Sequence, residues 1–419
     1  MDRDEVARHQ RARLEGAMIE AVARHGFAST TIRELVTLAG VSKSTFYEHF
    51  EGKEDCFLAT FDGIMAQLTE EVVAAYEPPG EPRERLLRAL DRFTAIVAER
   101  PEAISFVTVD SLTLGAAAVA RREKSWEGFE TIAREHLSPA AGDAEASELT
   151  VRAVVAGTTG VIYRCLRGGR GAELRELVEP LIDWAFSFAQ PDSEGVRDAI
   201  AAAERPAPAP PAREPAADLP GWEEPPDSPL SRSSLSQRER IVRAAVRVVV
   251  ERGYGALSIP AISATAGTSN QTFYENFNSK RDAFLAGYEN ISAEALQRTS
   301  AALDQAQDGP EAVGSALRAL CEYIAGNELY ARLAFFELPT AGPPALDRAD
   351  ETIDLLVSFL ERGQEERGDA EPLPRVVLEA TAAGIWFVIQ REIAHDRRRS
   401  LPDVAGQLAR IALVPLTRA

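Results

Sequence analysis

Two short stretches of the chain, far apart in sequence, concentrate side chains that can hydrogen bond to the edges of nucleic-acid bases. Both sets are small and polar, namely Ser42, Lys43, Ser44, Thr45 and His49 in the first stretch and Ser269, Asn270, Gln271, Thr272 and Asn276 in the second. A lysine can donate to O6 and N7 of guanine, and Asn or Gln can pair with N6 and N7 of adenine. These residue types therefore favour recognition by hydrogen bonding, provided that the surrounding elements expose them.

The two stretches belong to an internal repeat with a constant offset. The string S-K-S-T-F-Y-E-H-F at 42–50 recurs as S-N-Q-T-F-Y-E-N-F at 269–277, so the offset is 269 − 42 = 227. Between positions 13 and 62, 18 of 50 residues are identical at this offset without a gap. Ala156-Gly157 aligns with Ala383-Gly384 at the same offset, which indicates that a whole unit was duplicated.

A proline-rich segment separates the copies. Residues 201–230 read AAAERPAPAPPAREPAADLPGWEEPPDSPL. Proline lacks a backbone N–H and fixes φ, so this stretch favours an extended, semi-rigid linker. We therefore predict five segments: 1–60 and 235–287 as small N-terminal domains, 61–195 and 288–419 as larger helical domains, and 196–234 as the linker.

Helical periodicity dominates each copy, and glycines interrupt it at matching places. An apolar stripe at 14–22 ends at Gly26, and the equivalent stripe at 241–249 ends at Gly253. Thr30 or Thr31 in the first copy and Ser258 in the second are good N-caps for a short second helix, and Ser42 and Ser269 for a third. We also expect Thr31 and Ser258 to contact nucleic acid. The tight turns between these helices are Ala39-Gly40-Val41 and Ala266-Gly267-Thr268. Two short helices joined by a glycine-containing turn are typical of a helix-turn-helix, which predicts an all-α fold.

The strings across these turns resemble one known family. A-G-V-S-K-S-T-F-Y-E-H-F-x-G-K-E-D in the first copy and A-G-T-S-N-Q-T-F-Y-E-N-F-N-S-K-R-D-A-F in the second resemble the DNA-binding domain of the TetR family. The resemblance implies two tandem units, each a three-helix DNA-binding domain followed by a helical ligand-binding and dimerisation domain. It also implies a transcriptional regulator, by default a repressor, that binds a double-stranded DNA operator. Phosphate contacts are expected from Tyr47, Lys53, Tyr274 and Lys280.

The two helix-turn-helix domains, called here the first and second heads, differ in the residues that would face the bases. We therefore expect the DNA operator to be an imperfect palindrome with two unlike half-sites. Residues 1–55 hold 8 Lys and Arg against 10 Asp and Glu, whereas residues 232–282 hold 8 against 4. Phosphate neutralisation then favours the second head, and we expect it to supply most of the affinity. Basic arms are predicted before each head, formed by Arg8, Arg11 and Arg13 and by Arg232, Arg238 and Arg240.

The larger domains are expected to enclose a small-molecule effector, apolar or aromatic as is usual for the family. The aromatic candidates for a pocket are Phe93, Phe106, Trp126, Phe129, Tyr163, Tyr323, Tyr330, Phe335 and Trp386, although such a stripe is more often plain core. The family's dimer interface corresponds here to 146–167 with 174–189 and to 374–395 with 404–417. The two halves could pair within one chain as a pseudo-dimer, or two chains could pair as a homodimer.

Composition excludes several other classes. The net charge of −19 is unlike that of a general nucleic-acid coat, and the three cysteines show no metal or disulfide spacing. We find no phosphate-binding glycine loop, no nucleophile motif, no signal peptide and no membrane-spanning run, so no enzyme activity, cofactor or membrane contact is expected. A cytoplasmic protein is expected. A sensor or scaffold whose heads have lost DNA binding stays an alternative.

Overall fold

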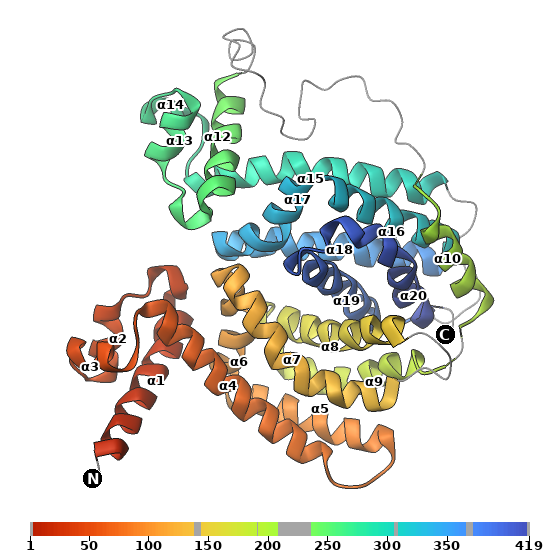
Figure 1. The fold of residues 1–419 in the computed structure, drawn as a ribbon, viewed down its shortest axis with the longest axis horizontal. Helices are drawn as coiled ribbons and strands as arrows, with labels where there is room; N and C mark the ends of the chain where they lie inside the picture. Colours follow the sequence, from red (N-terminus) through yellow and green to blue (C-terminus); the bar gives the residue numbers. More distant parts are fainter. Residues whose placement is uncertain are drawn as a thin grey trace. The chain divides into compact units, whose positions relative to one another are not determined.

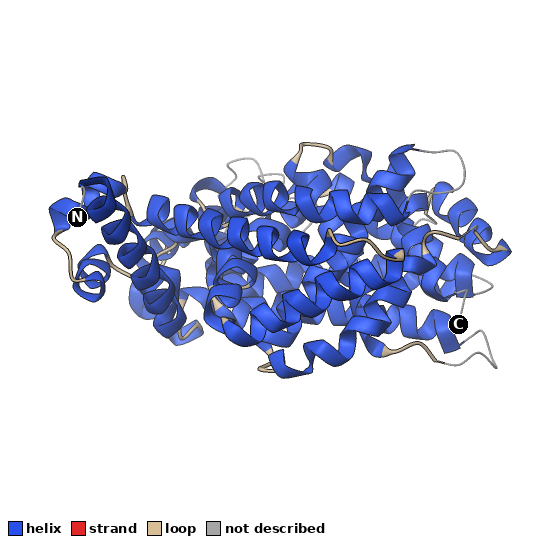
Figure 2. Cartoon of the chain, turned by 90° about the horizontal axis from the view of Figure 1, so that it is seen from below, coloured by secondary structure: helices blue, strands red, loops and turns tan. Residues whose placement is uncertain are grey.

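The computed structural model describes residues 3–137, 144–190, 192–207, 236–305, 309–365 and 372–416, and these residues contain helices and loops but no strand (Figures 1 and 2). The chain forms two compact units. Unit 1 comprises Met1–Pro191 with Pro374–Phe387, and unit 2 comprises Asp192–Leu373 with Val388–Ala419.

The helices up to residue 190 follow one another in this order: α1 (Arg3–Ser29), α2 (Ile32–Ala39), α3 (Lys43–His49), α4 (Lys53–Tyr76), α5 (Pro82–Glu99), α6 (Pro101–Thr108), η1 (Asp110–Leu114), α7 (Ala116–Leu137), α8 (Ala144–Arg167), η2 (Gly171–Leu177) and α9 (Val178–Ser187). The later ones are α10 (Glu194–Glu204), α12 (Gln237–Arg252), η3 (Tyr254–Ala256), α13 (Ile259–Ala266), α14 (Asn270–Asn276), α15 (Lys280–Gln305), α16 (Gly309–Gly326), α17 (Glu328–Arg332), η4 (Leu333–Glu337), η5 (Leu338–Ala341), α18 (Pro343–Glu365), α19 (Arg375–Ala394), η6 (Arg398–Val404) and α20 (Ala405–Leu416).

The sequence offset of 227 also relates the helices themselves. It relates the starts of α3 and α14 (270 − 43), of α5 and α16 (309 − 82), and of α9 and α20 (405 − 178). Because these starts coincide without a shift, the duplicated units align from the first short helices to the last helix. Each position in one copy therefore has a defined counterpart in the other.

Glycines at positive φ make the turns of both small domains. Gly26 and Gly253 have φ of 79° and 78° at the end of the first long helix, and Gly40 and Gly267 have φ of 60° and 63° before the third helix. Only glycine adopts this region without steric cost. The helix-turn-helix geometry therefore follows from four residues that the sequence already marks.

Aromatic packing holds each small domain together in the same way. Phe46 and Phe273 are fully buried, and Arg11 lies over the ring of Phe50 as Arg238 lies over Phe277, at 5.2 Å and 4.6 Å. The predicted basic arms are thus wrong where they can be seen. Arg8, Arg11 and Arg13 lie within α1, and Arg238 and Arg240 lie within α12, because the apolar stripe extends each helix toward the N-terminus. Arg232 lies outside the described residues.

The predicted linker also begins too early, because 196–204 are helical. Ser193 caps α10, and Val196, Ala199, Ala202 and Ala203 form its buried stripe. The prolines that stop the helix start only at 206. α10 packs in unit 2, where a Cβ on Gly314 of α16 would lie 2.3 Å from the carbonyl oxygen of Ala199. The rest of the predicted linker, 208–234, lies outside the described residues.

Small residues let α8 pack tightly against the first part of α19 in unit 1. A Cβ on Gly157 would lie 2.3 Å from the carbonyl oxygen of Ala380, and one on Gly384 would lie 2.6 Å from that of Ala153. Nε1 of Trp184 in α9 donates to Oγ1 of Thr381 at 3.0 Å. Residues from the last quarter of the sequence thus complete the core of unit 1.

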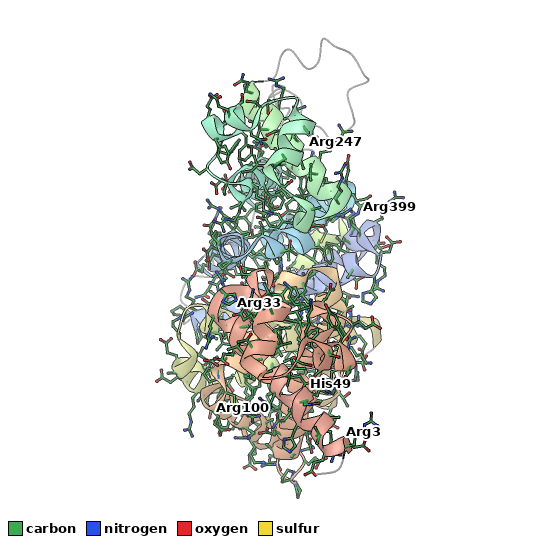
Figure 3. The ribbon with its side chains drawn as sticks, turned by 90° about the vertical axis from the view of Figure 1, so that its left-hand side faces the viewer. Arg3, Arg33, His49, Arg100, Arg247 and Arg399 are labelled. Atoms are coloured by element: carbon green, nitrogen blue, oxygen red, sulfur yellow. The ribbon has the colours of Figure 1, made fainter. Side chains whose placement is uncertain are left out.

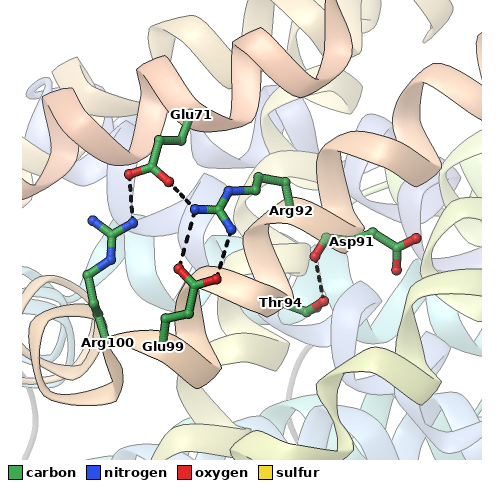
Figure 4. Close-up of polar contacts among 6 residues, drawn as sticks. All are labelled: Glu71, Asp91, Arg92, Thr94, Glu99 and Arg100. Carbon is green, nitrogen blue, oxygen red and sulfur yellow. Dashed lines mark hydrogen bonds and ion pairs between the residues drawn. The ribbon is translucent and has the colours of Figure 1, made fainter.

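An ion network joins α4 to α5 in unit 1 (Figure 4). Glu71 accepts from Arg92 and, at 2.6 Å, from Arg100, while Arg92 also bonds Glu99 at 3.0 Å. The two guanidinium groups lower the pKa of Glu71. The counterparts of Glu71 and Arg92 are Arg298 and Ala319, so this network is a property of one copy only.

One helical segment in the described part of the chain, Glu148–Arg167 of α8, is long and apolar enough to span a bilayer by length and composition alone. Its most apolar window has a mean hydropathy of 1.2 and is 72% buried within the protein. That burial is what a core helix of this length requires.

Candidate nucleic-acid interface and ligand cavity

The third helix of each small domain buries one aromatic side chain and exposes the next. Phe46 and Phe273 are fully buried, whereas Tyr47 and Tyr274 are 51% and 59% exposed. Exposed large aromatic side chains are rare elsewhere in the described residues. Figure 3 shows the side chains that the helices carry, with Arg33 and His49 labelled on the first domain.

The exposed face of these helices also carries the predicted base-facing residues. Lys43 and Ser44 of α3 and Asn270 and Gln271 of α14 are exposed to solvent. Nε2 of Gln271 donates a hydrogen bond to Oε1 of Glu275 at 3.1 Å. The first turn of each helix therefore presents exposed polar side chains, and this turn is the part that faces the major groove in a helix-turn-helix.

Several predicted contact residues have a structural task as N-caps. The hydroxyls of Thr31, Ser42, Ser258 and Ser269 each accept a hydrogen bond from the backbone three residues later. Thr45 and Thr272 hydrogen bond to Ser42 and Ser269 at 2.9 Å and 3.0 Å. Such caps stabilise a helix by about 1 kcal/mol.

Two further predicted base-facing residues, His49 and Asn276, lie at the ends of their helices and are half-buried. Nδ2 of Asn276 donates to the carbonyl oxygen of Thr272 at 2.9 Å, and the ring of His49 packs near Phe50. Both face the domain more than solvent.

The two lysines predicted to contact phosphate each donate a hydrogen bond within their own domain. Nζ of Lys53 donates to the carbonyl oxygen of Phe27 at 2.8 Å and lies over its ring, and burial lowers the pKa of this lysine. Nζ of Lys280 donates to the carbonyl oxygen of Leu257 at 2.7 Å and lies over Tyr254. In this structure Lys53 joins the start of α4 to the end of α1, and Lys280 joins the start of α15 to the residue that follows η3.

Unit 1 also contains a partly open cavity of about 140 Å³ between α4, α5, α7, α8 and α9. Most of its wall is apolar, made by residues such as Val72, Leu86, Leu90, Phe93, Phe129, Ile132, Val155, Ile162, Leu181 and Phe186. The polar side chains in the wall are His136, Thr158 and Thr159. The cavity can therefore hold a small apolar group with one polar end.

The polar end is organised around Tyr76, at the end of α4. Its hydroxyl lies 2.6 Å from Oε2 of Glu135 and 2.6 Å from Nε2 of His136. The guanidinium of Arg85 covers the tyrosine ring and lies 3.7 Å from Glu135. Burial and the hydrogen bond to Glu135 raise the pKa of Tyr76 to about 12, and burial lowers the pKa of His136. We call these four side chains the Tyr76 cluster.

Comparison with known proteins finds similarity in the first helices of each copy. The family model described as bacterial regulatory proteins, tetR family, matches the chain twice, at residues 16–60 and 241–286. Each match begins within the first long helix of one copy, covers both short helices and ends in the first turns of the next long helix.

The chain is similar to the TetR family over the first helices of each copy.

It carries two tandem TetR-like units, as the repeat and the turn motifs predicted, and the all-α prediction is also confirmed. The chain is 30% identical over 77 residues to the HTH-type transcriptional regulator BetI of Rhizobium meliloti (strain 1021), which covers 18% of this chain and 38% of that protein. It is 24% identical over 82 residues to the fatty acid metabolism regulator protein of Bacillus subtilis (strain 168), which covers 20% and 42%. The chain thus matches about two fifths of the length of each relative.

Solved structures of similar proteins align with less than half of the chain. The fatty acid degradation regulator FadR from Bacillus halodurans aligns with 42% of this chain and 94% of its own, at 15% identity and a TM-score of 0.38. A TetR-like transcriptional regulator from Rhodococcus sp. RHA1 aligns with 41% and 93%, at 21% identity and a TM-score of 0.35.

Of the nine aromatic residues predicted for a pocket, Phe93 and Phe129 line the unit 1 cavity. Phe106 instead stacks on Phe57 at 4.1 Å, at the joint between α4 and α6. The others are buried outside this cavity: Trp126, Tyr163, Tyr323, Tyr330, Phe335 and Trp386. Among them, Tyr323 donates to the carbonyl oxygen of Ile291 and packs on Tyr330, as core tyrosines do.

Sequence reasoning missed the polar wall of the cavity. A comparison of the two copies contains a signal for it, because His136, Thr158 and Thr159 correspond to Gly363, Ile385 and Trp386. A polar residue that is apolar or absent in the duplicate is not required by the shared fold.

Proposed function

We propose that this chain is a sequence-specific DNA-binding transcriptional regulator, acting as a repressor, whose affinity for its operator is set by a small-molecule effector in unit 1. The observation that carries the proposal is that α3 and α14 expose similar sets of side chains. In both, an exposed tyrosine stands beside a capped helix start whose outward side chains differ, Lys43-Ser44 in one and Asn270-Gln271 in the other.

The difference between the heads supports an operator with two unlike half-sites. Lysine and asparagine or glutamine favour different bases in the major groove, and each good pairing discriminates by about 1–3 kcal/mol. The exposed tyrosines would serve both halves alike, as contacts that set register. Lys53 and Lys280 would then support the heads rather than contact the operator.

The path of α4 supports regulation by an effector. Its first turns pack Phe57 against Phe27 of the head, and Val72 near its end lines the cavity. A ligand that displaces the cavity wall therefore acts on the helix that also anchors the head. Phe57 also stacks on Phe106 of α6, which is a second contact between the larger domain and the first turns of α4.

We also propose that one chain works as an intramolecular pseudo-dimer in the cytoplasm. The close packing of Gly157 on Ala380 and of Gly384 on Ala153 supports this, because it uses a helix of each copy at matching positions. A homodimer with four heads is the competing assembly. A solution mass measurement distinguishes the two.

The function is tested by selecting sites for the intact protein from a random DNA pool and sequencing the enriched molecules. Two unlike half-sites at a fixed spacing are the expected result. A perfect palindrome would replace the pseudo-dimer by two chains that each use one dominant head. No enrichment by a folded protein would overturn the DNA-binding proposal and leave a sensor or scaffold.

A further inference from the structure

The two copies differ sharply where the Tyr76 cluster lies. At the offset of 227, Tyr76 and Arg85 correspond to Leu303 and Ala312. In unit 2 these two form a buried hydrophobic cluster with Ala316, and Phe359 packs against it. The same set of helices is thus assembled there by apolar side chains.

Unit 2 therefore shows that this fold does not need a polar cluster at this place. Partly buried polar groups cost free energy unless they are paired, and apolar packing of similar volume is often as stable or more so. Unit 1 nevertheless places a hydroxyl, a carboxylate, an imidazole and a guanidinium together beside its cavity. The most direct use for such a group is to meet the polar part of a ligand.

The positions of the protons in the Tyr76 cluster determine whether the ligand must donate or accept a hydrogen bond. Tyr76 has one hydroxyl proton, which it donates to Oε2 of Glu135. The tyrosine oxygen then accepts the Nε2–H of His136. A neutral histidine protonated at Nε2 has an acceptor at Nδ1. Nδ1 of His136 has no hydrogen-bond partner among the described residues.

The imidazole is neutral near pH 7, because burial lowers the pKa of His136 and Arg85 acts in the same direction, with Glu135 opposing them. The wall around it is apolar apart from the hydroxyls of Thr158 and Thr159. A carboxylate ligand that approached Nδ1 would therefore meet a lone pair, and the guanidinium of Arg85 is already paired with Glu135.

We propose that the unit 1 cavity binds one small uncharged molecule per chain, with an apolar body and a hydroxyl or N–H group that donates to Nδ1 of His136. The proposal rests on the proposed function in taking this cavity as the effector site. A volume of about 140 Å³ is close to that of a protein cavity known to hold benzene, so the body is of that size. Phenols and short-chain alcohols have this chemistry.

Calorimetric titration of the full chain, without DNA, tests the proposal with four probes: phenol, its methyl ether anisole, toluene and benzoate. Phenol should bind with a stoichiometry of one and about tenfold more tightly than the other three, since only phenol is a neutral donor. Benzoate or anisole binding as tightly as phenol would overturn the proposal. So would two sites per chain, or preference for a long-chain fatty acid.

Two variants in the cluster separate hydrogen bonding from shape. His136→Leu should bind phenol and toluene equally. Tyr76→Phe removes the acceptor that fixes the histidine tautomer, so the preference for phenol over anisole should fall several-fold. Tyr288→Phe is the matched control, because its hydroxyl bonds Thr352 in unit 2, and it should leave the preference unchanged. Thermal unfolding of each variant confirms that it folds.

Operator binding is measured separately on the same samples. Phenol binding without any change in operator affinity would overturn the proposed regulation but leave the ligand assignment intact. Normal operator binding with no response to phenol in the calorimeter would overturn the ligand assignment alone.

Discussion

The carboxylate of Glu337 accepts a hydrogen bond from the backbone N–H of Tyr254, 3.0 Å away. Glu337 ends the π-helical turn η4, and Tyr254 follows the glycine that ends the first helix of the second head. The bond therefore joins a DNA-binding domain to the larger domain of the same unit. The counterpart of Glu337 in unit 1 is Asp110, one methylene shorter.

Glu337→Ala should loosen the second head. The change leaves the amide of Tyr254 without its charged acceptor, and hydrogen bonds to charged groups contribute about 1.5–3 kcal/mol. Hydrogen exchange at the Tyr254 amide should accelerate by at least tenfold, while amides in α2 of the first head keep their rates. Equal acceleration in both heads would mean that the effect is global and not local to this bond.

Asp110→Asn should stabilise the protein at neutral pH. Burial raises the pKa of Asp110 from 3.8 to about 6, so the folded state favours the protonated acid. The resulting destabilisation begins as pH rises above 3.8 and is complete above about 6. At pH 7.5 the variant should gain about 2 kcal/mol in urea unfolding, and at pH 4 it should match the parent. A gain of the same size at both pH values would contradict a titration origin.

Gly157→Ala should destabilise unit 1. Its Cβ would lie 2.3 Å from the backbone oxygen of Ala380, which cannot move without displacing α19. Overpacking of this kind costs about 1–3 kcal/mol. Gly63→Ala in α4 is the matched control, because nothing lies within 4 Å of its Cβ, and it should be neutral or stabilising. Thermal unfolding of both variants makes the comparison, and a neutral Gly157→Ala would remove the close-packing argument.

Tyr274→Ala should weaken operator binding more than Tyr47→Ala. Each substitution would remove a proposed phosphate contact, worth about tenfold in affinity, and the second head is the more basic of the two, so its contact should contribute more. Fluorescence anisotropy with the selected operator at one fixed salt concentration gives the comparison. Leu355→Ala, an exposed residue of α18, is the control and should bind as the parent does. Equal losses from the two tyrosines would contradict dominance of the second head.

The turns and caps could be predicted from sequence because single residues decide them locally. Glycines 26, 40, 253 and 267 and the capping hydroxyls lie where the motifs placed them, since their φ preferences and short side chains act within a few residues. The directions of Lys53 and Lys280 could not be predicted in this way. Their partners, the carbonyl oxygens of Phe27 and Leu257, come from a distant helix end.

Prediction of the residues that line the cavity required information from even more distant parts of the chain. Phe93 and Phe129 were among the aromatic candidates, but so were Phe106 and Trp126, which have the same composition signal and pack elsewhere. Periodicity identifies which residues are buried but not which of them border empty space. The polar wall at His136 was detectable only as a difference between the two copies.

The membership of the two compact units has a consequence for the history of the gene. Unit 2 contains α10, encoded before the proline-rich segment, and unit 1 contains residues 374–387, encoded near the end. A recombination event that separated the copies would deprive unit 2 of α10 and unit 1 of part of α19. Either half of the sequence alone would therefore lack part of the core that it has in the full chain, so the two copies should be inherited together.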